Sequence, residues 1–331
     1  MEKQQWNPGI LLQLSGQYWS TCALHAAVEL DVFTALGDKQ LTGGDIAQKL
    51  KVNQEGTVRL LNALTAMDLV MKENDYFSNT RAGKTFLSKD SPEYIGHIIT
   101  HHHHLVDSWS KLDQAVKTGT PVRERVSHTS AEWRESFLMG MFNIAMSTAP
   151  LLVDKLDLSG RNHMLDLGGG PGTYAIHFCL KNPALKATVY DLPTTRPFAE
   201  KTIENFGLTD RIDFMDGNYV KQGIEGVYDV AWLSQILHGE GRKDCQRIIK
   251  KTVSALEPAG MLIVHDFILN NTMDGPLFPA LFSLNMFLGT SEGQSYSEKQ
   301  ITDMLAKAGV KKIRRLSFKG PTDSGIIVGT V

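Results

Sequence analysis

The apolar positions in the N-terminal part of the chain predict helices first and a short hairpin afterwards. From about Trp6 to Leu36 they recur every three or four residues, which is the period of an amphipathic helix. Residues 41–50 and the stretch after Asn53 predict two short capped helices. Residues 70–77 predict a strand, a polar turn and a second strand. Helix, helix and hairpin in this order indicate a winged helix.

The C-terminal half carries a different pattern. Residues from about 92 to 156 look helical throughout, and after Gly160 short β-rich runs alternate with amphipathic helices. This alternation predicts a mostly parallel sheet with helices on both faces, with strands at residues 163–167, 187–190, 212–215, 228–233 and 261–267. Two final strands at 313–318 and 325–331 flank a turn at 319–324, which predicts that they pair antiparallel.

The length of 331 residues exceeds the usual size of one domain and favours two. We expect an α/β fold: a Rossmann-like domain with a seven-stranded, mostly parallel sheet, preceded by a helical bridge, over residues 96–331. A mainly α-helical winged-helix domain is expected over residues 1–95.

Composition and charge narrow the classes of function. A formal net charge of -2 does not favour a binder of nucleic acid or anionic membranes, which needs a basic face. A ligand-sensing DNA-binding regulator remains an alternative for a winged helix, but the recognition helix would offer only Arg59 as a basic residue. Three scattered cysteines without CxxC spacing favour neither disulfides nor a zinc ribbon. The apolar stretch at residues 10–12 is too short for a signal peptide, so we expect a cytoplasmic protein.

A glycine-rich turn follows the first predicted strand of the sheet. Asp166 lies at the strand end, and Gly168, Gly170 and Gly172 let the backbone approach a ligand before the next helix. A dinucleotide fingerprint needs a third glycine three residues after the second, where this chain has Thr173. The shorter spacing suits a cofactor without a pyrophosphate, although a purely structural glycine turn gives the same pattern.

Acidic and aromatic residues follow the next two strands. Asp191, with Leu192 after it, lies about twenty positions beyond the turn, where a carboxylate can accept hydrogen bonds from ribose hydroxyls. The third strand end offers acceptors for an adenine amino group and an aromatic ring for its face, in Asp216, Gly217, Asn218 and Tyr219. A turn cap is the alternative role for Asp216.

With these motifs in order, the chain resembles the class I S-adenosylmethionine-dependent O-methyltransferases, the group that contains acetylserotonin, plant caffeate and bacterial polyketide methyltransferases. The resemblance runs from the winged helix, a dimerisation domain in that family, to Ala308, Gly309 and Val310. It implies S-adenosylmethionine as cofactor, a homodimer formed through the N-terminal domain, and a small hydroxylated, aromatic acceptor, with no nucleic-acid or membrane partner. It also adds Ser234 and Gln235 to the cofactor-binding residues, at the place of a basic residue common in the family.

The resemblance implies a catalytic pair. His238 matches the family's catalytic histidine, a general base that removes the proton of the acceptor hydroxyl. Asp266, at the end of a later strand, is the acid expected to orient it.

Several positions depart from the family pattern. Gly239 and Glu240 stand where Asp-Trp is usual, Ser295 stands near a lost acid, and Asn218 replaces an aspartate. These altered acids leave a second interpretation open, an enzyme that keeps the cofactor for hydroxylation or rearrangement.

The same match predicts an acceptor pocket with apolar groups for a flat ring and one polar edge, from Trp109, Phe142, Met146, Asn285 and Met286. Core packing is the alternative for the apolar members. His97, His101 and His104 share one face of a helix, where they could bind zinc or line a pocket. The polar face is favoured, and we expect no metal.

Overall fold

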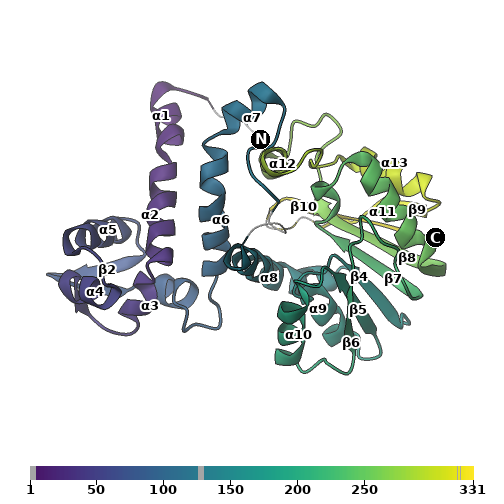
Figure 1. Cartoon of the computed structure of the whole chain (residues 1–331), viewed down its shortest axis with the longest axis horizontal. Helices are drawn as coiled ribbons and strands as arrows, with labels where there is room; N and C mark the ends of the chain where they lie inside the picture. The colour runs from purple at the N-terminus through teal and green to yellow at the C-terminus, as the bar shows by residue number, and fades with distance from the viewer. Residues whose placement is uncertain (1–4, 126–129, 319, 321) are drawn as a thin grey trace. The chain divides into compact units, whose positions relative to one another are not determined.

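The chain divides into two units, Met1–Val106 and Asp107–Val331, in a computed structural model that describes residues 5–125, 130–318, 320 and 322–331 (Figure 1). The boundary expected after residue 95 lies just before α6 (Gly96–Trp109), whereas the division between the units falls inside this helix. Each unit has its own sheet.

The first unit is mainly helical. Its other helices are α1 (Pro8–Gly16), α2 (Tyr18–Glu29), α3 (Val32–Leu36), α4 (Gly43–Leu50), α5 (Gln54–Ala66) and the π-helical turn η1 (Gly83–Leu87). Strands β1 (Leu41–Thr42), β2 (Val70–Glu73) and β3 (Tyr76–Asn79) form an antiparallel sheet in the order β1-β3-β2. A capping box between Thr42 and Asp45 starts α4, and the Asn53 side chain accepts the Gly56 N–H at the start of α5. Both expected helix caps are present. That this unit is a winged helix remains a prediction.

The helical run expected from about residue 92 to 156 is wrong in its middle. α7 (Leu112–Thr118) ends at Gly119, whose φ of +70° lies in the left-handed region, and Pro121 follows. α8 (Ala131–Val153) begins only after Ser130, whose side chain caps it. The described residues between the two helices are not helical. Glycine in the left-handed conformation with proline soon after it is a common way for a helix to end.

One described helix, α8, is long and apolar enough to cross a membrane by length and composition. Its side chains at Leu138, Ala145 and Leu152 are buried inside the second unit. Helices in the core of a protein can have this length and apolar composition too. The contact of α8 with the helix that follows the glycine turn explains the apolar surface of α8.

A seven-stranded sheet forms the centre of the second unit, in the order β6-β5-β4-β7-β8-β10-β9. Its strands are β4 (His163–Leu167), β5 (Lys186–Asp191), β6 (Ile212–Asp216), β7 (Tyr228–Ser234), β8 (Leu256–Phe267), β9 (Lys311–Arg315) and β10 (Ser324–Thr330). β4 to β8 pair parallel, and β10 pairs antiparallel with β8 and β9. The predicted α/β fold and final antiparallel pair are confirmed. Lys319 and Pro321 of the predicted turn lie outside the described residues.

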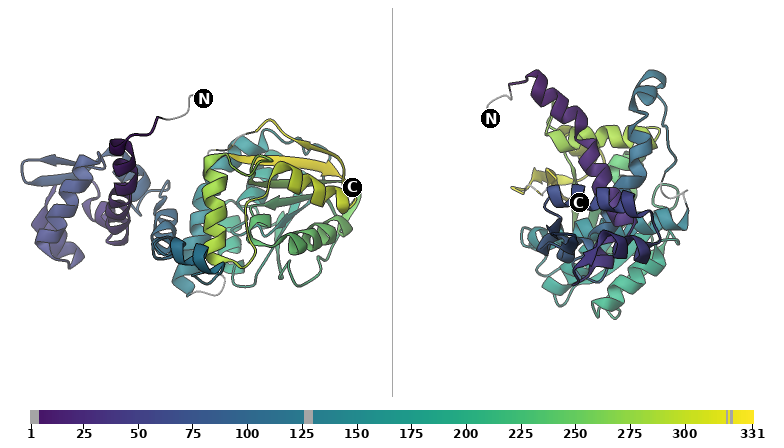
Figure 2. Two further views of the ribbon diagram at one scale, coloured as in Figure 1. Left: turned by 90° about the horizontal axis from the view of Figure 1, so that it is seen from above. Right: turned by 90° about the vertical axis from the view of Figure 1, so that its left-hand side faces the viewer.

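Helices cover both faces of this sheet (Figure 2). They are α9 (Thr173–Lys181), α10 (Arg196–Asn205), α11 (Arg242–Ser254), α12 (Leu277–Gly289) and α13 (Glu298–Lys307), with the 3-10 turn η3 (Leu237–Gly239). One core joins the sheet to α8, α9 and α10, and a second core joins it to α11 and α13. Neighbouring strand residues alternate between the two cores, as Met164 and Leu165 do.

The strand order reverses between β4 and β7, which places a ligand crevice at the carboxyl ends of these strands. The strand ends are in register: Leu167 pairs with Leu233, Asp191 with Asp216, and Ser234 with His265. The glycine turn, Asp191 and the residues after β7 therefore lie along one edge of the sheet.

Candidate active site

The turn after β4 is shaped for the close approach of a ligand. Gly168, Gly170 and Gly172 have φ of +67°, +55° and +77°, which residues with a Cβ rarely adopt. A Cβ at Gly168 would lie 2.6 Å from Ile236, whereas a Cβ at Gly170 would meet no atom within 4 Å. Gly172 precedes α9, so the unpaired N–H groups of that helix lie at the turn. The open space over Gly170 fits the adenosyl cofactor that the sequence implies.

Asp166 lies beneath the glycine turn. It is buried, its Oδ2 accepts the Ala175 N–H over 3.3 Å, and its Oδ1 has no hydrogen-bond partner among the described residues. A Cβ at Gly169 would come within 2.7 Å of Oδ2. Burial raises the pKa of Asp166 to about 7. A buried oxygen with hydrogen-bonding capacity left fits a donor on a bound ligand.

Asp191 contacts the glycine turn directly. Its Oδ2 accepts the Gly170 N–H over 2.9 Å, and its Oδ1 accepts the Leu192 N–H over 2.6 Å and the Thr195 hydroxyl over 3.3 Å. Burial raises its pKa, and these three donors act in the opposite direction. A carboxylate accepts about four hydrogen bonds, so Asp191 keeps capacity for a ribose hydroxyl.

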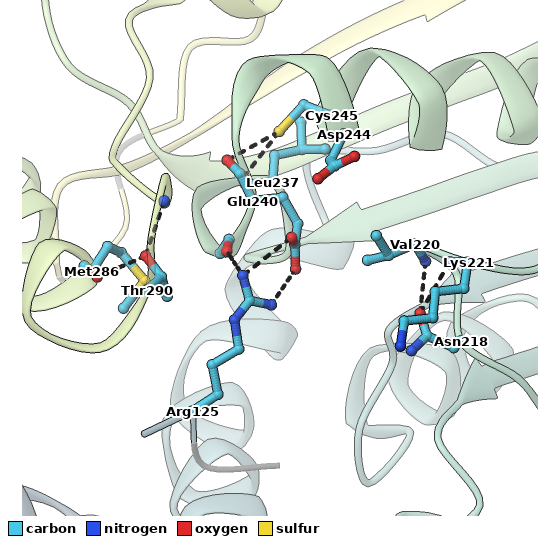
Figure 3. Close-up of polar contacts among 12 residues, drawn as sticks. Arg125, Asn218, Val220, Lys221, Leu237, Glu240, Asp244, Cys245, Met286 and Thr290 are labelled. Carbon is cyan, nitrogen blue, oxygen red and sulfur yellow. Dashed lines mark hydrogen bonds and ion pairs between the residues drawn. The ribbon is translucent and has the colours of Figure 1, made fainter. Parts of the chain in front are cut away.

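The segment after β6 uses its polar side chains within the protein. Asp216 forms an ion pair with Arg196 of α10, with 2.9 Å between Nη2 and Oδ2. Asn218 Oδ1 accepts the N–H groups of Val220 and Lys221 over 3.0 and 3.2 Å (Figure 3). Asn218 therefore caps a turn, which is the alternative role that the sequence suggested for Asp216. Asp216 instead pairs with Arg196, a partner that the sequence pattern did not indicate.

Tyr219 places its ring beside the glycine turn. A Cβ at Gly168 would lie 3.2 Å from Tyr219 Cε1. In the same segment, a Cβ at Gly217 would overlap the Tyr190 hydroxyl, so this position requires glycine. Lys251 of α11 donates to the carbonyls of Tyr219 and Val220 and so fixes this segment. An aromatic ring next to the turn is suited to the face of a purine.

Ser234, at the end of β7, contacts a buried histidine rather than open space. Its Oγ lies 2.9 Å from His265 Nδ1, and His265 Nε2 lies 3.0 Å from Ser324 Oγ. Burial lowers the pKa of His265 to about 4, so the ring is neutral at pH 7. Gln235 follows with φ of +55°, and its N–H donates to the His265 carbonyl. The strained backbone at Gln235 turns the chain from β7 into η3.

His238 and Asp266 lie within hydrogen-bond distance. His238 Nδ1 is 2.7 Å from Asp266 Oδ1, which also accepts the Phe267 N–H over 2.8 Å, and all three residues are buried. A carboxylate only accepts hydrogen bonds, so this contact places the ring proton on Nδ1 and leaves the lone pair on Nε2. A neutral imidazole in this tautomer has the form of a general base.

Two phenylalanine rings pack against the imidazole of His238, and a third packs against these two. Phe267 stacks on the imidazole with 5.9 Å between ring centroids, and Phe282 of α12 meets it edge-on at 4.7 Å. Phe278, one turn earlier on α12, packs 4.9 Å from Phe267. The sequence did not indicate these rings, although Phe278 and Phe282 have helical spacing with Met286. The rings make an apolar wall beside His238 that suits a flat molecule.

Buried and partly buried groups hold the turn that carries His238. Arg125 forms an ion pair with Glu240 over 2.6 Å and donates to the Gly239 carbonyl over 2.9 Å (Figure 3). The Tyr296 hydroxyl donates to the Glu240 carbonyl over 2.6 Å, and the Cys245 thiol contacts the Leu237 carbonyl over 3.1 Å. Glu240, displaced from the usual family position, thus has a structural partner. Ser295, near the position of the acid that this chain lacks, is buried, as is Tyr296.

The expected acceptor residues come from three helices. Asn285 and Met286 lie on α12, which contacts η3, and Asn285 Oδ1 accepts a bond from Arg123 over 3.1 Å. Phe142 and Met146 lie half-buried on α8, where Met146 Sδ is 3.4 Å from His177 Nε2 on α9. Trp109 is half-buried at the end of α6.

The histidine run lies on α6. His101 is buried, and His97 packs edge-on against Tyr94 with 5.3 Å between ring centroids. Across the part of the chain that the structure describes, no group of three His, Cys, Asp or Glu side chains is placed to hold a metal ion.

The fold and the crevice define an α/β methyltransferase. A model of an O-methyltransferase domain matches residues 109–311, and a model of the O-methyltransferase dimerisation domain matches residues 12–89. The chain belongs to this O-methyltransferase family and is an S-adenosylmethionine-dependent O-methyltransferase. The family, activity and cofactor expected from the sequence are confirmed. The dimerisation domain supports a homodimer, and a small-molecule acceptor is expected.

Known relatives cover nearly the whole chain. A 3-hydroxy-5-methyl-1-naphthoate 3-O-methyltransferase of Streptomyces sahachiroi is 30% identical over 97% of this chain and 95% of its own length. The acetylserotonin O-methyltransferase of Gallus gallus is 28% identical over 93% of each chain. The structure of PigF with SAH superposes with a TM-score of 0.90 at 25% identity, covering 98% of this chain and 100% of PigF.

Proposed function

We propose that this methyltransferase methylates a hydroxyl of a small aromatic acceptor, with His238 as general base and Asp266 as the residue that orients it. The observation that carries the proposal is the 2.7 Å contact between His238 Nδ1 and Asp266 Oδ1. It leaves Nε2 as the proton acceptor on the ring. The name of the Streptomyces sahachiroi relative, a 3-O-methyltransferase of a hydroxylated naphthoate, supports an aromatic acceptor.

The residues around His238 have separate tasks in this mechanism. S-adenosylmethionine would supply, when bound, a methyl group that can pass in line to an oxygen nucleophile, with the sulfonium sulfur as the leaving group. His238 Nε2 takes the hydroxyl proton, and the Asp266 carboxylate stabilises the imidazolium that forms. The Phe267 and Phe282 rings hold the acceptor flat and exclude water. Alignment is the larger contribution, roughly 7–11 kcal/mol against about 3–5 kcal/mol for the base.

The edge of the sheet supplies the proposed cofactor site. Gly168, Gly170 and Gly172 give the backbone space, and Asp191 and Leu192 adjoin the ribose. Asp166 offers the unpartnered oxygen beneath the turn. The adenine is proposed to lie beside the segment after β6, at Asp216, Gly217, Asn218 and Tyr219. Ser234 and Gln235, at the end of β7, are proposed as further cofactor contacts.

The acceptor is proposed to lie along α12, where Asn285 and Met286 are close to the phenylalanine rings. Phe142 and Met146 on α8 and Trp109 on α6 are further candidates for this pocket, and their half-burial supports that role.

Product mass tests this function directly. The purified enzyme is incubated with methyl-labelled S-adenosylmethionine and a panel of hydroxylated naphthalenes and phenols, with their O-methyl ethers as matched blanks. We expect label in the product and the mass of one added methyl group, only from acceptors with a free hydroxyl. An added oxygen or an isomer of unchanged mass would instead support hydroxylation or rearrangement on the same cofactor.

The first unit is proposed to form the homodimer. α1 and α2 expose large apolar side chains, Leu11, Leu12, Leu14, Tyr18 and Trp19, to solvent. An exposed apolar surface of this kind is typical of an interface between chains.

A cytoplasmic location is also proposed, supported by free thiols at Cys22, Cys179 and Cys245.

A further inference from the structure

Two arginines in the segment before α8 have different surroundings. Arg125 pairs with the Glu240 carboxylate over 2.6 Å. Arg123 donates from Nη2 to the Asn285 carbonyl over 2.9 Å and to Asn285 Oδ1 over 3.1 Å, and from Nη1 to the Ser108 hydroxyl over 3.4 Å. All of these acceptors are neutral. No carboxylate of the described residues lies within 4.0 Å of the Arg123 nitrogens.

The Arg123 side chain is half-buried, and no carboxylate of the described residues pairs with its guanidinium. Burial lowers its pKa to about 10, which still leaves it cationic at pH 7. A partly desolvated cation is costly unless an anion joins it. Of the five N–H groups of a guanidinium, three have the acceptors above, so the Arg123 side chain keeps some capacity to donate hydrogen bonds.

Backbone hydrogen bonds and a glycine position the Arg123 side chain. The N–H groups of Val122 and Arg123 both donate to the Leu288 carbonyl, over 3.0 and 3.1 Å, which ties the segment to the end of α12. A Cβ at Gly289 would lie 2.5 Å from Arg123 Nε. Gly289 has an ordinary helical backbone, so its φ does not require glycine. The absence of a side chain at this position leaves room for the guanidinium of Arg123.

α12 connects Arg123 with His238. The Phe282 ring lies 4.7 Å from the His238 ring, and Asn285, which holds Arg123, follows three residues later on the same face of the helix. An acceptor with its hydroxyl at His238 and its ring along α12 would have its far edge directed toward Asn285 and Arg123.

We propose that Arg123 binds an anionic substituent, a carboxylate, on the far edge of the aromatic acceptor and thereby selects hydroxylated aromatic acids over neutral phenols. The inference rests on the proposed function, because it takes the acceptor to lie between His238 and α12. Arg123 is a specificity-determining residue, and Gly289 and Asn285 position it.

The test compares a hydroxynaphthoate, its carboxamide and the naphthol without the acid group, with the hydroxyl at the same place in each. Affinities are measured by calorimetry on the full chain saturated with S-adenosylhomocysteine, and kcat/KM is measured with S-adenosylmethionine. We expect wild type to prefer the naphthoate, and Arg123→Gln to lower naphthoate affinity about 10- to 100-fold, the size of a charged hydrogen bond. The naphthol should change less than about threefold.

Two further variants separate recognition from folding. Gly289→Ala keeps the arginine but displaces its guanidinium, so it should lower the preference for the naphthoate in the same direction. Arg314→Gln removes an exposed arginine in β9 and the same unit of charge, and it should leave the preference unchanged.

The outcomes are distinct for the two proposals. Equal affinity of wild type for naphthoate and naphthol, or a parallel loss for both in Arg123→Gln, overturns the role of Arg123 while S-adenosylhomocysteine binding and methylation remain. Failure of wild type to bind S-adenosylhomocysteine or to methylate any member of the panel overturns the proposed function itself.

Discussion

His238 Nδ1 and Asp266 Oδ1 lie 2.7 Å apart although 28 residues separate them in the chain. The parallel pairing of β7 with β8 brings them together, since Ser234 at the end of β7 is in register with His265. The acid that the sequence places on a later strand is thus the one that meets the histidine. In the proposed function, this pair marks the place where an acceptor hydroxyl is deprotonated.

Replacement of the base tests that assignment. We expect His238→Ala to lower kcat about 10²- to 10⁴-fold, because a positioned general base contributes that much. Binding of S-adenosylhomocysteine should be unchanged, since the proposed cofactor site lies on the glycine turn. Turnover of His238→Ala at the wild-type rate would show that the enzyme works by aligning the acceptor with the methyl group, without a general base.

Two glycines provide a matched test of the cofactor turn. Gly170 and Gly207 have φ of +55° and +66°, and a Cβ at either would meet no atom within 4 Å. Alanine at each position should cost about 1–2 kcal/mol of unfolding free energy through backbone strain alone. Only Gly170→Ala should also weaken binding of S-adenosylhomocysteine, measured by calorimetry. Equal affinities in the two variants would show that the ligand does not use the space over Gly170.

The ion pair between Arg125 and Glu240 should matter for turnover through the position of His238. Arg125→Met leaves the buried Glu240 carboxylate without its cation, and we expect a loss of about 1–3 kcal/mol in unfolding free energy and a lower kcat. Adding Glu240→Gln removes the uncompensated charge, so the double variant should be more stable than Arg125→Met. Simple additivity in the double-mutant cycle, from urea unfolding, would argue that the two side chains act independently.

His265 predicts a pH dependence of stability. Its pKa falls from 6.5 to about 4 on folding, so the stability it contributes is present above pH 6.5 and is lost as the pH falls toward 4. The full loss amounts to about 3 kcal/mol. Urea unfolding of wild type and His265→Gln between pH 7.5 and 4 should show a steeper decline for wild type. Parallel curves would refute the assignment.

The exposed face of α1 and α2 predicts the oligomeric state. Leu12 and Trp19 are 74% and 69% exposed, and a double change to glutamate should convert a dimer to a monomer in sedimentation experiments. Leu180→Glu, at a 50% exposed position on α9 of the second unit, is the control and should leave the mass unchanged. A dimer that survives both sets of changes would place its interface elsewhere.

The sequence alone determined the features that depend on neighbouring residues. The caps at Thr42 and Asn53 and the strands that end at Asp191 and Asp216 follow from local patterns, because a cap or a strand end is encoded within a few residues. The spacing of Gly168, Gly170 and Gly172 likewise indicated a cofactor without a pyrophosphate. The break after α7 was missed, although Gly119 and Pro121 signal it.

Only the tertiary structure decided which distant groups hold Glu240, two residues after His238, and Asn285 on the neighbouring helix α12. Arg125 reaches Glu240 across 115 residues, Tyr296 reaches the same residue across 56, and Arg123 reaches Asn285 across 162. No local period or motif encodes such contacts, since they depend on how the segment before α8 and the helix α12 pack around η3. The sequence therefore indicated the cofactor turn and the proposed base, and the packing of separate segments determined what holds His238 and where Arg123 lies.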